Sequence, residues 1–146
     1  SNFYVNIDKN SYVKIGKNFT SRSGCKFFVK KGGKLIIGDN VFFNHNTYIY
    51  CNNEVVIGNN TIFGPNTYIF DHNHKISSSG PLRNELNLKK VSIGQNVWVG
   101  ASCNLLAGTR VEDNSIISAN STVKSHIPPK TIYSLDKQFY KITKLI

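Results

Sequence analysis

Two histidines and an aspartate stand together near the middle of the chain, in the run Asp71-His72-Asn73-His74. Imidazole changes its protonation near neutral pH, so histidine is the side chain best suited to take a proton from a reacting hydroxyl or amine. The run precedes a polar stretch, residues 75–90, that contains Ser-Ser-Ser-Gly-Pro. Long polar loops in compact domains are commonly functional. We therefore predict acid–base chemistry at the root of an extruded loop.

The elements that hold this run follow a six-residue repeat. Every sixth residue from Ile93 to Val123 is aliphatic, and the residue four positions later is small or β-branched. A period of six fits neither an α-helix nor a plain strand, and it predicts one flat side of a coil, a short strand followed by a corner. Three sides make a coil of about 18 residues, and stacked coils give parallel strands. The predicted fold class is all-β, a parallel β-helix.

The chain is expected to be one domain, residues 1–146, with an irregular start. Residues 1–35 follow the repeat only faintly, because Ser21 stands where an aliphatic residue is expected. We predict that this segment forms an irregular first rung that caps the column. The frame is clean from Ile37, apart from two extra residues that widen one corner near Cys51.

The other end of the column is predicted from two prolines. Pro128-Pro129 follows the last clean repeat, and proline cannot donate a hydrogen bond to the ladder between coils. The coil is therefore expected to end there. Residues 130–146 would form a basic and aromatic C-terminal tail, either a short helix or a strand along the column.

Composition excludes several classes of function. The net charge of +10 arises from 18 lysines and arginines against 8 acidic residues, but the basic residues are scattered, so nucleic-acid binding is not expected. No apolar run is long enough to span a bilayer, and the start SNFYVNIDKN lacks the features of a signal peptide. Three cysteines without a CxxC pair fit a reducing compartment. These features predict a cytoplasmic protein without membrane insertion, whose cysteines belong to the core.

Two motifs carry a resemblance to a known family. Gly64-Pro-Asn-Thr-Tyr-Ile-Phe-Asp-His-Asn-His74 is followed by the loop and then by Ile93-Gly-Gln-Asn-Val-Trp-Val-Gly100. In order and spacing the chain resembles the hexapeptide-repeat acetyltransferases, in particular the galactoside and maltose acetyltransferases and the sugar O-acetyltransferases of capsule and lipopolysaccharide synthesis. The resemblance implies a left-handed coil, acetyl-CoA as acetyl donor, a sugar acceptor, and a homotrimer with active sites between subunits.

The resemblance also assigns roles to particular residues. The general base falls on His74, an acceptor-binding residue on Asn44, and the cofactor-binding residues on Trp98, Ala101, Ala119 and Lys124. His72, two residues before His74 on an extended strand, faces the same side, and it is expected to bind the acceptor together with Asp71. No metal ligand is implied. His74 would take the proton from the acceptor as it attacks the thioester directly, without an acyl-enzyme. The segment Tyr133 to Lys137 departs from the family pattern where the adenine end of the cofactor would bind.

Two alternatives stay open. A γ-type carbonic anhydrase has the same fold and binds zinc through three histidines, for which His45, His72 and His74 are the candidates, although the spacing of the last two departs from that pattern. A noncatalytic trimeric scaffold would also have this repeat. The loop at 75–90 is expected to line the acceptor pocket, whose specificity the sequence leaves open.

Overall fold

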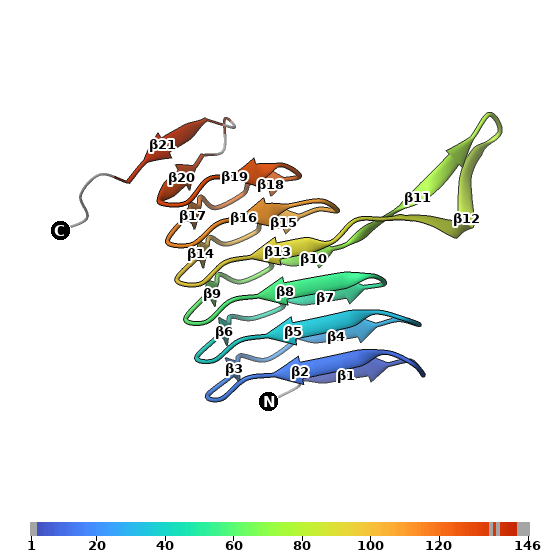
Figure 1. Ribbon diagram of the computed structural model, residues 1–146, viewed down its shortest axis with the longest axis horizontal. Coiled ribbons are helices and arrows are strands. Elements are labelled where there is room, and N and C mark those ends of the chain that lie inside the picture. Colours follow the sequence, from blue (N-terminus) through green and yellow to red (C-terminus); the bar gives the residue numbers. More distant parts are fainter. Residues whose placement is uncertain (1–2, 135, 137, 143–146) are drawn as a thin grey trace.

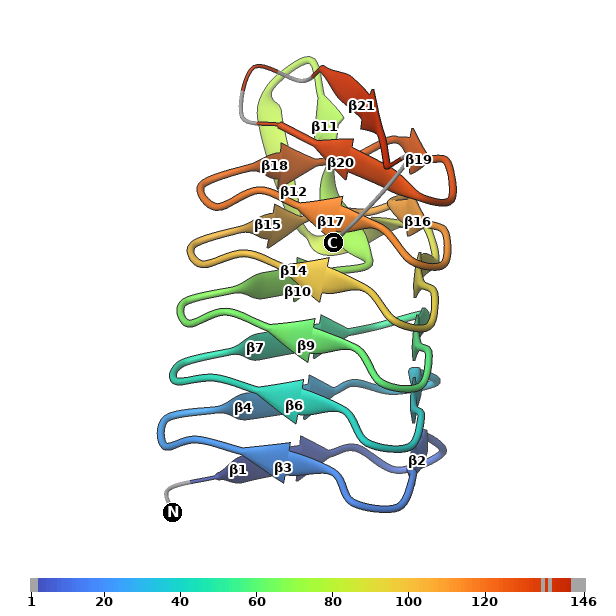
Figure 2. The ribbon, with the colours of Figure 1, turned by 90° about the vertical axis from the view of Figure 1, so that its left-hand side faces the viewer.

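The computed structural model describes residues 3–134, 136 and 138–142, and it is built from strands. The chain winds as a column of stacked coils, and each complete coil contributes one strand to each of three flat faces (Figures 1 and 2). The predicted parallel β-helix is confirmed. None of the described residues forms a helix long and apolar enough to cross a membrane.

Each face is a sheet whose strands come from successive coils. Face A contains β1 (Tyr4–Ile7), β4 (Lys26–Val29), β7 (Tyr48–Cys51), β10 (Tyr68–Phe70), β15 (Asn104–Leu105) and β18 (Thr122–Val123). Face B contains β2 (Tyr12–Ile15), β5 (Lys34–Ile37), β8 (Glu54–Ile57), β13 (Val91–Ile93), β16 (Arg110–Val111) and β19 (His126–Ile127). Face C contains β3 (Thr20–Ser21), β6 (Phe42–Phe43), β9 (Ile62–Phe63), β14 (Trp98–Val99), β17 (Ile116–Ile117), β20 (Thr131–Tyr133) and the antiparallel β21 (Phe139–Lys141).

Three corners separate the faces. The hairpin corner, between faces A and B, contains residues 8–11, 30–33, 52–53, 71–90, 106–109 and 124–125. The asparagine corner, between faces B and C, contains residues 16–19, 38–41, 58–61, 94–97, 112–115 and 128–130. The alanine corner, between faces C and A, contains residues 22–25, 44–47, 64–67, 100–103 and 118–121.

The interior of the column follows the repeat. The aliphatic positions from Ile93 to Val123 are at most 2% exposed, and the small positions Val97, Cys103, Thr109, Ser115 and Ser121 are equally buried. Asparagines with positive φ turn the chain at the corners, and at the asparagine corner Asn18 donates to Asn40 and Asn40 to Asn60 at 3.0 Å. The predicted core is thus confirmed, with the cysteines inside it.

The first coil is more regular than predicted. Tyr4 pairs with Lys26 and Lys26 with Tyr48, so the first coils take 22 residues each, against 18 between Trp98 and Ile116. The face A and face B strands of these coils have four residues each, against two in β15 and β16, and this length puts residues 1–35 out of the six-residue frame. Ser21 lies in register with Phe43, and the aromatic ring of Phe19 packs 5.4 Å from that of Phe43. Bulky rings therefore fill the end of the column.

The coil also continues past the two prolines, which corrects the predicted end. Pro128 and Pro129 lie in the last asparagine corner. In the coils below, Gly94 and Glu112 donate to the next coil from the place of Pro128, but β19 is the last described strand of face B, so no higher coil needs a donor there. β20 then pairs in parallel with β17, and β21 folds back on β20, so the start of the tail is a strand. The predicted tail reaches residue 146, and its residues 135, 137 and 143–146 lie outside the described part of the chain.

The extruded segment is a β-hairpin rather than a loop without structure. β11 (His72–Ser77) and β12 (Gly80–Leu88) pair antiparallel and project from the hairpin corner away from the column (Figure 1). The register shifts between His74 and Lys75. This bulge bends the hairpin and interrupts the alternation of side chains between its two faces, so the sequence of this segment does not show a regular two-residue pattern. The hairpin emerges at the corner that has only two residues, Asn52 and Asn53, in the coil directly below, so the predicted wider corner near Cys51 is wrong.

Candidate active site

Asp71 anchors the hairpin to the column. Its side chain is fully buried at the last position before β11. The carboxylate accepts the backbone N–H of Asn52 at 2.9 Å and that of Asn53 at 2.6 Å. These donors belong to the hairpin corner of the coil below. The two residues of this short corner therefore supply the N–H groups that hold the carboxylate in place.

His72 is oriented by the same carboxylate. Its Nδ1 lies 3.0 Å from Oδ1 of Asp71, and its side chain is 17% exposed. Because a carboxylate oxygen accepts this bond, Nδ1 carries the proton and the lone pair is on Nε2. The ring of Phe70 on face A lies 6.4 Å away at a steep angle. His72 is thus a fixed imidazole with one nitrogen available for chemistry.

His74 lies two residues farther along the same strand and is exposed. His72 pairs with Leu88 and His74 with Leu86, so both histidines belong to one face of the hairpin. Nδ1 of His74 lies 3.3 Å from the carbonyl oxygen of Leu82. A carbonyl only accepts, so this contact also leaves the lone pair on Nε2. The bulge that follows His74 brings Leu82 into reach.

The alanine corner carries the other predicted site residues. Asn44 is half-buried there, Ala101 follows Gly100, and Ala119 is exposed one coil higher. A Cβ added at Gly64 would lie 2.5 Å from the backbone nitrogen of Ala101, and one at Gly100 would lie 2.5 Å from that of Ala119. The turns therefore stack backbone on backbone. They leave a low, smooth ridge that carries only methyl side chains at Ala101 and Ala119.

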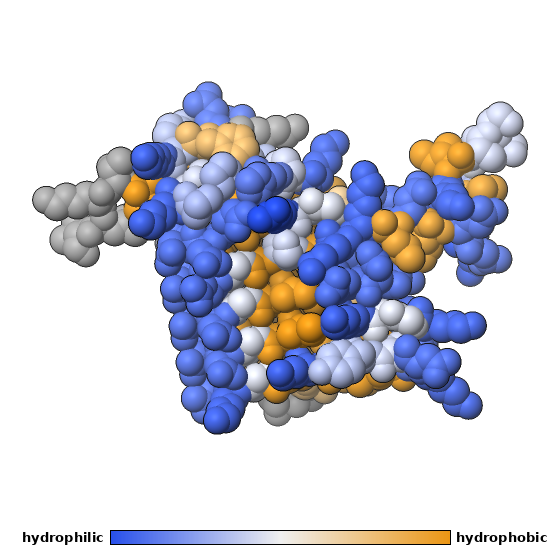
Figure 3. Space-filling view, in the orientation of Figure 1, coloured by the Kyte–Doolittle hydropathy of each residue, from blue (hydrophilic) through white to orange (hydrophobic). Residues whose placement is uncertain are grey.

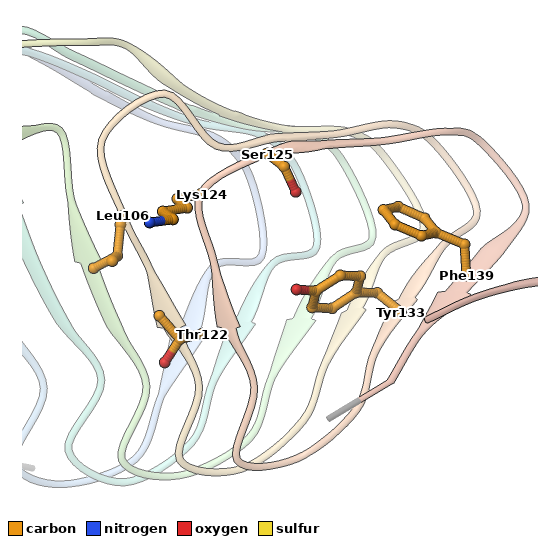
Figure 4. A pocket seen from close by; sticks show the side chains of 6 residues that line it. All are labelled: Leu106, Thr122, Lys124, Ser125, Tyr133 and Phe139. Atoms are coloured by element: carbon orange, nitrogen blue, oxygen red, sulfur yellow. The ribbon is translucent and has the colours of Figure 1, made fainter. Parts of the chain in front are cut away.

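Trp98 and Lys124 lie apart from this ridge. Trp98 is 52% exposed on face C, between Ile62 and Ile116. Lys124 lies on the hairpin corner of the last coil, at a pocket of about 370 Å³ that Tyr133 and Phe139 also line (Figure 4). The segment 133–137, where the family pattern is lost, is described at Tyr133, Ser134 and Asp136 only.

The predicted site is therefore split within one chain. The histidines lie on the hairpin corner, while Asn44, Ala101 and Ala119 lie on the alanine corner. Face A separates the two corners, and the four steps along the chain from Thr67 to Asp71 span about 13 Å in extended conformation. His45 also lies on the alanine corner, bonded to Ser23 at 2.9 Å. Among the described residues no three His, Cys, Asp or Glu side chains gather as a metal site.

Sequence reasoning missed the groups that orient the histidines. The backbone N–H groups of Asn52 and Asn53 and the carbonyl of Leu82 have no side-chain signature. The one available signal was the two-residue insertion near Cys51, which was interpreted as a wider corner. The structure corrects this interpretation, because the extra residues lengthen β7 and β8 and the corner consists only of Asn52 and Asn53, the donors for Asp71.

The cysteines offer no nucleophile. Burial, with the negative charge of Asp71 as a second cause, raises the pKa of the Cys51 thiol to about 12. Burial also raises the pKa of Cys25 and of Cys103. A thiol attacks as the thiolate, which these sites disfavour at neutral pH. The histidines are the groups at this corner that are suited to proton transfer.

Comparison with known proteins agrees with the resemblance found in the sequence. Residues 90–125 match the family described as bacterial transferase hexapeptide (six repeats). The galactoside O-acetyltransferase of Lactococcus lactis is 33% identical over 102 residues, which are 69% of this chain and 49% of that protein. The chain thus spans about half the length of the curated relatives it matches. The resemblance to hexapeptide-repeat acetyltransferases is confirmed.

Solved structures share the fold. A maltose O-acetyltransferase from Clostridium difficile is 28% identical with a TM-score of 0.56, and the match covers 95% of this chain and 65% of that one. A hexapeptide-repeat acetyltransferase from Vibrio cholerae is 22% identical with a TM-score of 0.78, and the match covers 89% and 74% of the two chains. At that identity the second likeness concerns the fold alone.

Proposed function

From the hexapeptide repeats at residues 90–125 and the relatives that share them, we propose that this chain is an acetyl-CoA-dependent acetyltransferase. It transfers the acetyl group to a hydroxyl or amine of a sugar-containing acceptor in the cytoplasm, in the synthesis of a surface polysaccharide. Named relatives act on galactosides and maltose, which supports a sugar acceptor. The observation that carries the proposal is the pair of oriented histidines on one strand, followed by the hexapeptide segment.

The general base in this proposal is His74. Its contact with Leu82 supports the tautomer of the neutral ring that has the proton on Nδ1 and the lone pair on Nε2. Nε2 takes the proton from the acceptor hydroxyl as the oxygen attacks the thioester carbon. The tetrahedral oxyanion then collapses, the bond from carbon to sulfur breaks, and the imidazolium returns its proton to the leaving thiolate. Acetylated acceptor and free CoA are the products, and the base is regenerated.

The acceptor and the donor approach from opposite ends of the column. Asn44 lies in the coils below the hairpin, and in the proposal it binds the acceptor together with His72 and its anchor Asp71. Ala101 and Ala119 lie above, where their methyl side chains leave room for the slender pantetheine arm. Trp98 flanks that arm. Lys124, in the pocket at the end of the column, contacts a phosphate of CoA.

A complete site requires a second copy of the chain. In a three-fold ring that turns face A toward the axis, the hairpin corner of one subunit meets the alanine corner of the next. Face A fits the inside of such a ring, because its outward side chains include the stacked rings of Phe28, Tyr50 and Phe70. Its single charged group, Lys26, lies 5.3 Å above the ring of Tyr48. A homotrimer with three shared sites follows.

The test is a coupled assay of acetyl transfer. The purified protein is incubated with acetyl-CoA and a panel of free sugars, oligosaccharides and nucleotide-sugars, and released CoA thiol is measured against acceptor acetylation by mass spectrometry. Acetylated sugar with stoichiometric CoA release is the expected result. Absence of both, with no CoA binding by calorimetry at low salt, would favour the noncatalytic scaffold.

The carbonic anhydrase alternative needs two copies as well, since His45 lies on a different corner from His72 and His74. Metal analysis of the purified protein and a CO₂ hydration assay distinguish it. Stoichiometric zinc together with hydration activity would replace the acetyltransferase proposal.

A further inference from the structure

The positive charge of the chain is concentrated on one edge of the column. The hairpin corner, with the hairpin, holds eight basic and three acidic side chains, namely Lys9, Lys30, Lys31, Lys75, Arg83, Lys89, Lys90 and Lys124 against Asp8, Asp71 and Glu85. The asparagine corner holds two basic and three acidic side chains, namely Lys17 and Lys130 against Asp39, Glu112 and Asp113. The positive charge is therefore distributed unevenly, with most of the excess on one edge of the column. Solubility alone would not require this uneven distribution.

Part of this edge is neutralised and part is not. Lys30 lies 3.5 Å from Asp8, and the same carboxylate accepts the backbone N–H of Lys31 at 3.2 Å. Lys75 pairs with Glu85, and Lys90 with Glu54. No carboxylate of the described residues lies within ion-pair distance of Lys9 or Lys31. Both side chains are exposed, so two uncompensated charges remain below the hairpin.

These two lysines lie on the acceptor side of the proposed site. Neighbouring strands are separated by about 4.8 Å, so the corner at Lys31 is about 10 Å below Asp71 and the corner at Lys9 about 14 Å below it. Figure 3 shows hydrophilic side chains projecting from this edge beside the first coils. The residues proposed for the donor, from Trp98 to Lys124, belong to the higher coils. The phosphates of CoA are therefore not the partners of Lys9 and Lys31.

We infer that the acceptor is an anionic sugar compound whose acidic group is bound by Lys9 and Lys31, about 10 to 14 Å from the hydroxyl that reacts. This inference rests on the proposed function and specifies its substrate class. A carboxylated oligosaccharide and a nucleotide-sugar, with its diphosphate, both have that chemistry. A single neutral hexose does not reach from the histidines to the lysines.

The experiment compares two charge-reversed proteins with the wild type. Lys9→Glu/Lys31→Glu inverts the proposed contact, while Lys14→Glu/Lys17→Glu makes the same change of net charge in the first coil, away from the hairpin corner. All four side chains are exposed, so both variants are expected to fold. The acceptors are an oligosaccharide containing glucuronic acid, a neutral N-acetylglucosamine oligomer of equal length, and a UDP-linked hexose. Binding is measured by calorimetry without acetyl-CoA, and turnover by release of CoA.

The wild type is expected to bind an anionic acceptor at least tenfold more tightly than the neutral one at low salt. Lys9→Glu/Lys31→Glu should weaken that binding about tenfold at low salt and about threefold at 0.1 M salt, since screening acts over about 10 Å. KM for acetyl-CoA and binding of the neutral oligomer should change less than twofold. The control variant should retain the preference. The anionic acceptor that the wild type binds more tightly, the oligosaccharide or the UDP-hexose, shows whether the lysines bind a carboxylate or a diphosphate.

Several results would overturn the inference while leaving the proposed function intact. One is acetyl transfer by the wild type with equal affinity for neutral and anionic acceptors. Another is an equal effect of the two variants, and a third is an effect of Lys9→Glu/Lys31→Glu on KM for acetyl-CoA alone. Absence of acetyl transfer to every acceptor instead contradicts the proposed function, and the calorimetric comparison still decides whether the lysines bind an anionic sugar.

Discussion

The buried carboxylate of Asp71 lies 3.0 Å from Nδ1 of His72 and accepts the backbone N–H groups of two residues one coil below. A single side chain thus links the hairpin, the column and the orientation of one histidine. Buried carboxylates are stable only when hydrogen-bonded, and the contacts at Asp71 meet that requirement. The hairpin has few other contacts that would fix its direction.

Replacement of Asp71 should therefore loosen the root of the hairpin. Asp71→Ala leaves the N–H groups of Asn52 and Asn53 without their acceptor, at a cost of roughly 3 kcal/mol in the free energy of unfolding. We expect a Tm lower by roughly 5–10 °C in calorimetry. Asp39→Ala is the matched control, because Asp39 accepts one backbone N–H from Lys17 in a less buried corner. An equal loss in both variants would contradict the anchoring role.

The repeat made the upper coils predictable because each interior position there recurs every six residues. Between Ile93 and Val123 every corner has four residues, so sequence frame and structure coincide. The first coils lose the frame because their face A and face B strands are longer and take 22 residues per coil. The two prolines were misjudged because the sequence does not show that they follow the last described strand of face B, where no higher coil requires an N–H donor.

The residues of the candidate site were inferred from the resemblance, and their arrangement was not predictable. The resemblance assigned roles to Asn44, His74 and Trp98, which lie on separate strands and corners. The sequence does not reveal that face A lies between Asn44 and His74, because that depends on the number of residues in each corner. Neither the hand of the coil nor the docking of a second copy follows from a six-residue period; both were inferred from the resemblance.

The pKa of Cys51 predicts a loss of stability at alkaline pH. The pKa is raised to about 12 in the folded chain, while an unfolded thiol titrates near 9.0. As the pH rises, the unfolded state therefore releases the thiol proton at a lower pH than the folded state does. The stabilisation is complete below pH 9 and is lost as the pH rises toward 12.

Cys51→Ala removes this titration and serves as the comparison. Between pH 7.5 and pH 10, the wild type should lose more of its free energy of unfolding than Cys51→Ala, as measured by urea denaturation. Lysines and tyrosines titrate in both proteins, so their effects cancel in the difference. An equal loss would show that the thiol titrates normally.

The aromatic stack on face A predicts where subunits meet. The ring of Tyr50 lies between those of Phe28 and Phe70, at 4.8 and 5.0 Å. If face A lines a three-fold axis, Tyr50→Glu introduces three charges close together in an apolar interface. Light scattering should then change from a trimer of about 49 kDa, three chains of 16.4 kDa, to the mass of one chain.

Val56→Glu is the control for this change. Val56 is half-buried and points outward on face B, so the substitution adds the same charge to another face. It should leave the trimer intact. Dissociation by Val56→Glu with a stable Tyr50→Glu trimer would assign the interface to face B, and a monomeric wild type at micromolar concentration would contradict the shared site.

The last prediction separates the two histidines. General-base assistance is typically worth 10²- to 10⁴-fold, whereas the loss of one acceptor hydrogen bond costs on the order of 1 kcal/mol, roughly five- to tenfold. His74→Ala should therefore lower kcat at least about a hundredfold with CoA affinity unchanged, while His72→Ala should mainly raise KM for the acceptor. Steady-state kinetics with acetyl-CoA and an accepted sugar measures both.

His72→Asn is a useful third variant, because its amide can still donate to Asp71 and keep the root of the hairpin intact. A hundredfold loss of kcat in His72→Asn with near-normal His74→Ala would assign the base to His72, and near-normal kinetics in all three variants would exclude both imidazoles from the proton transfer.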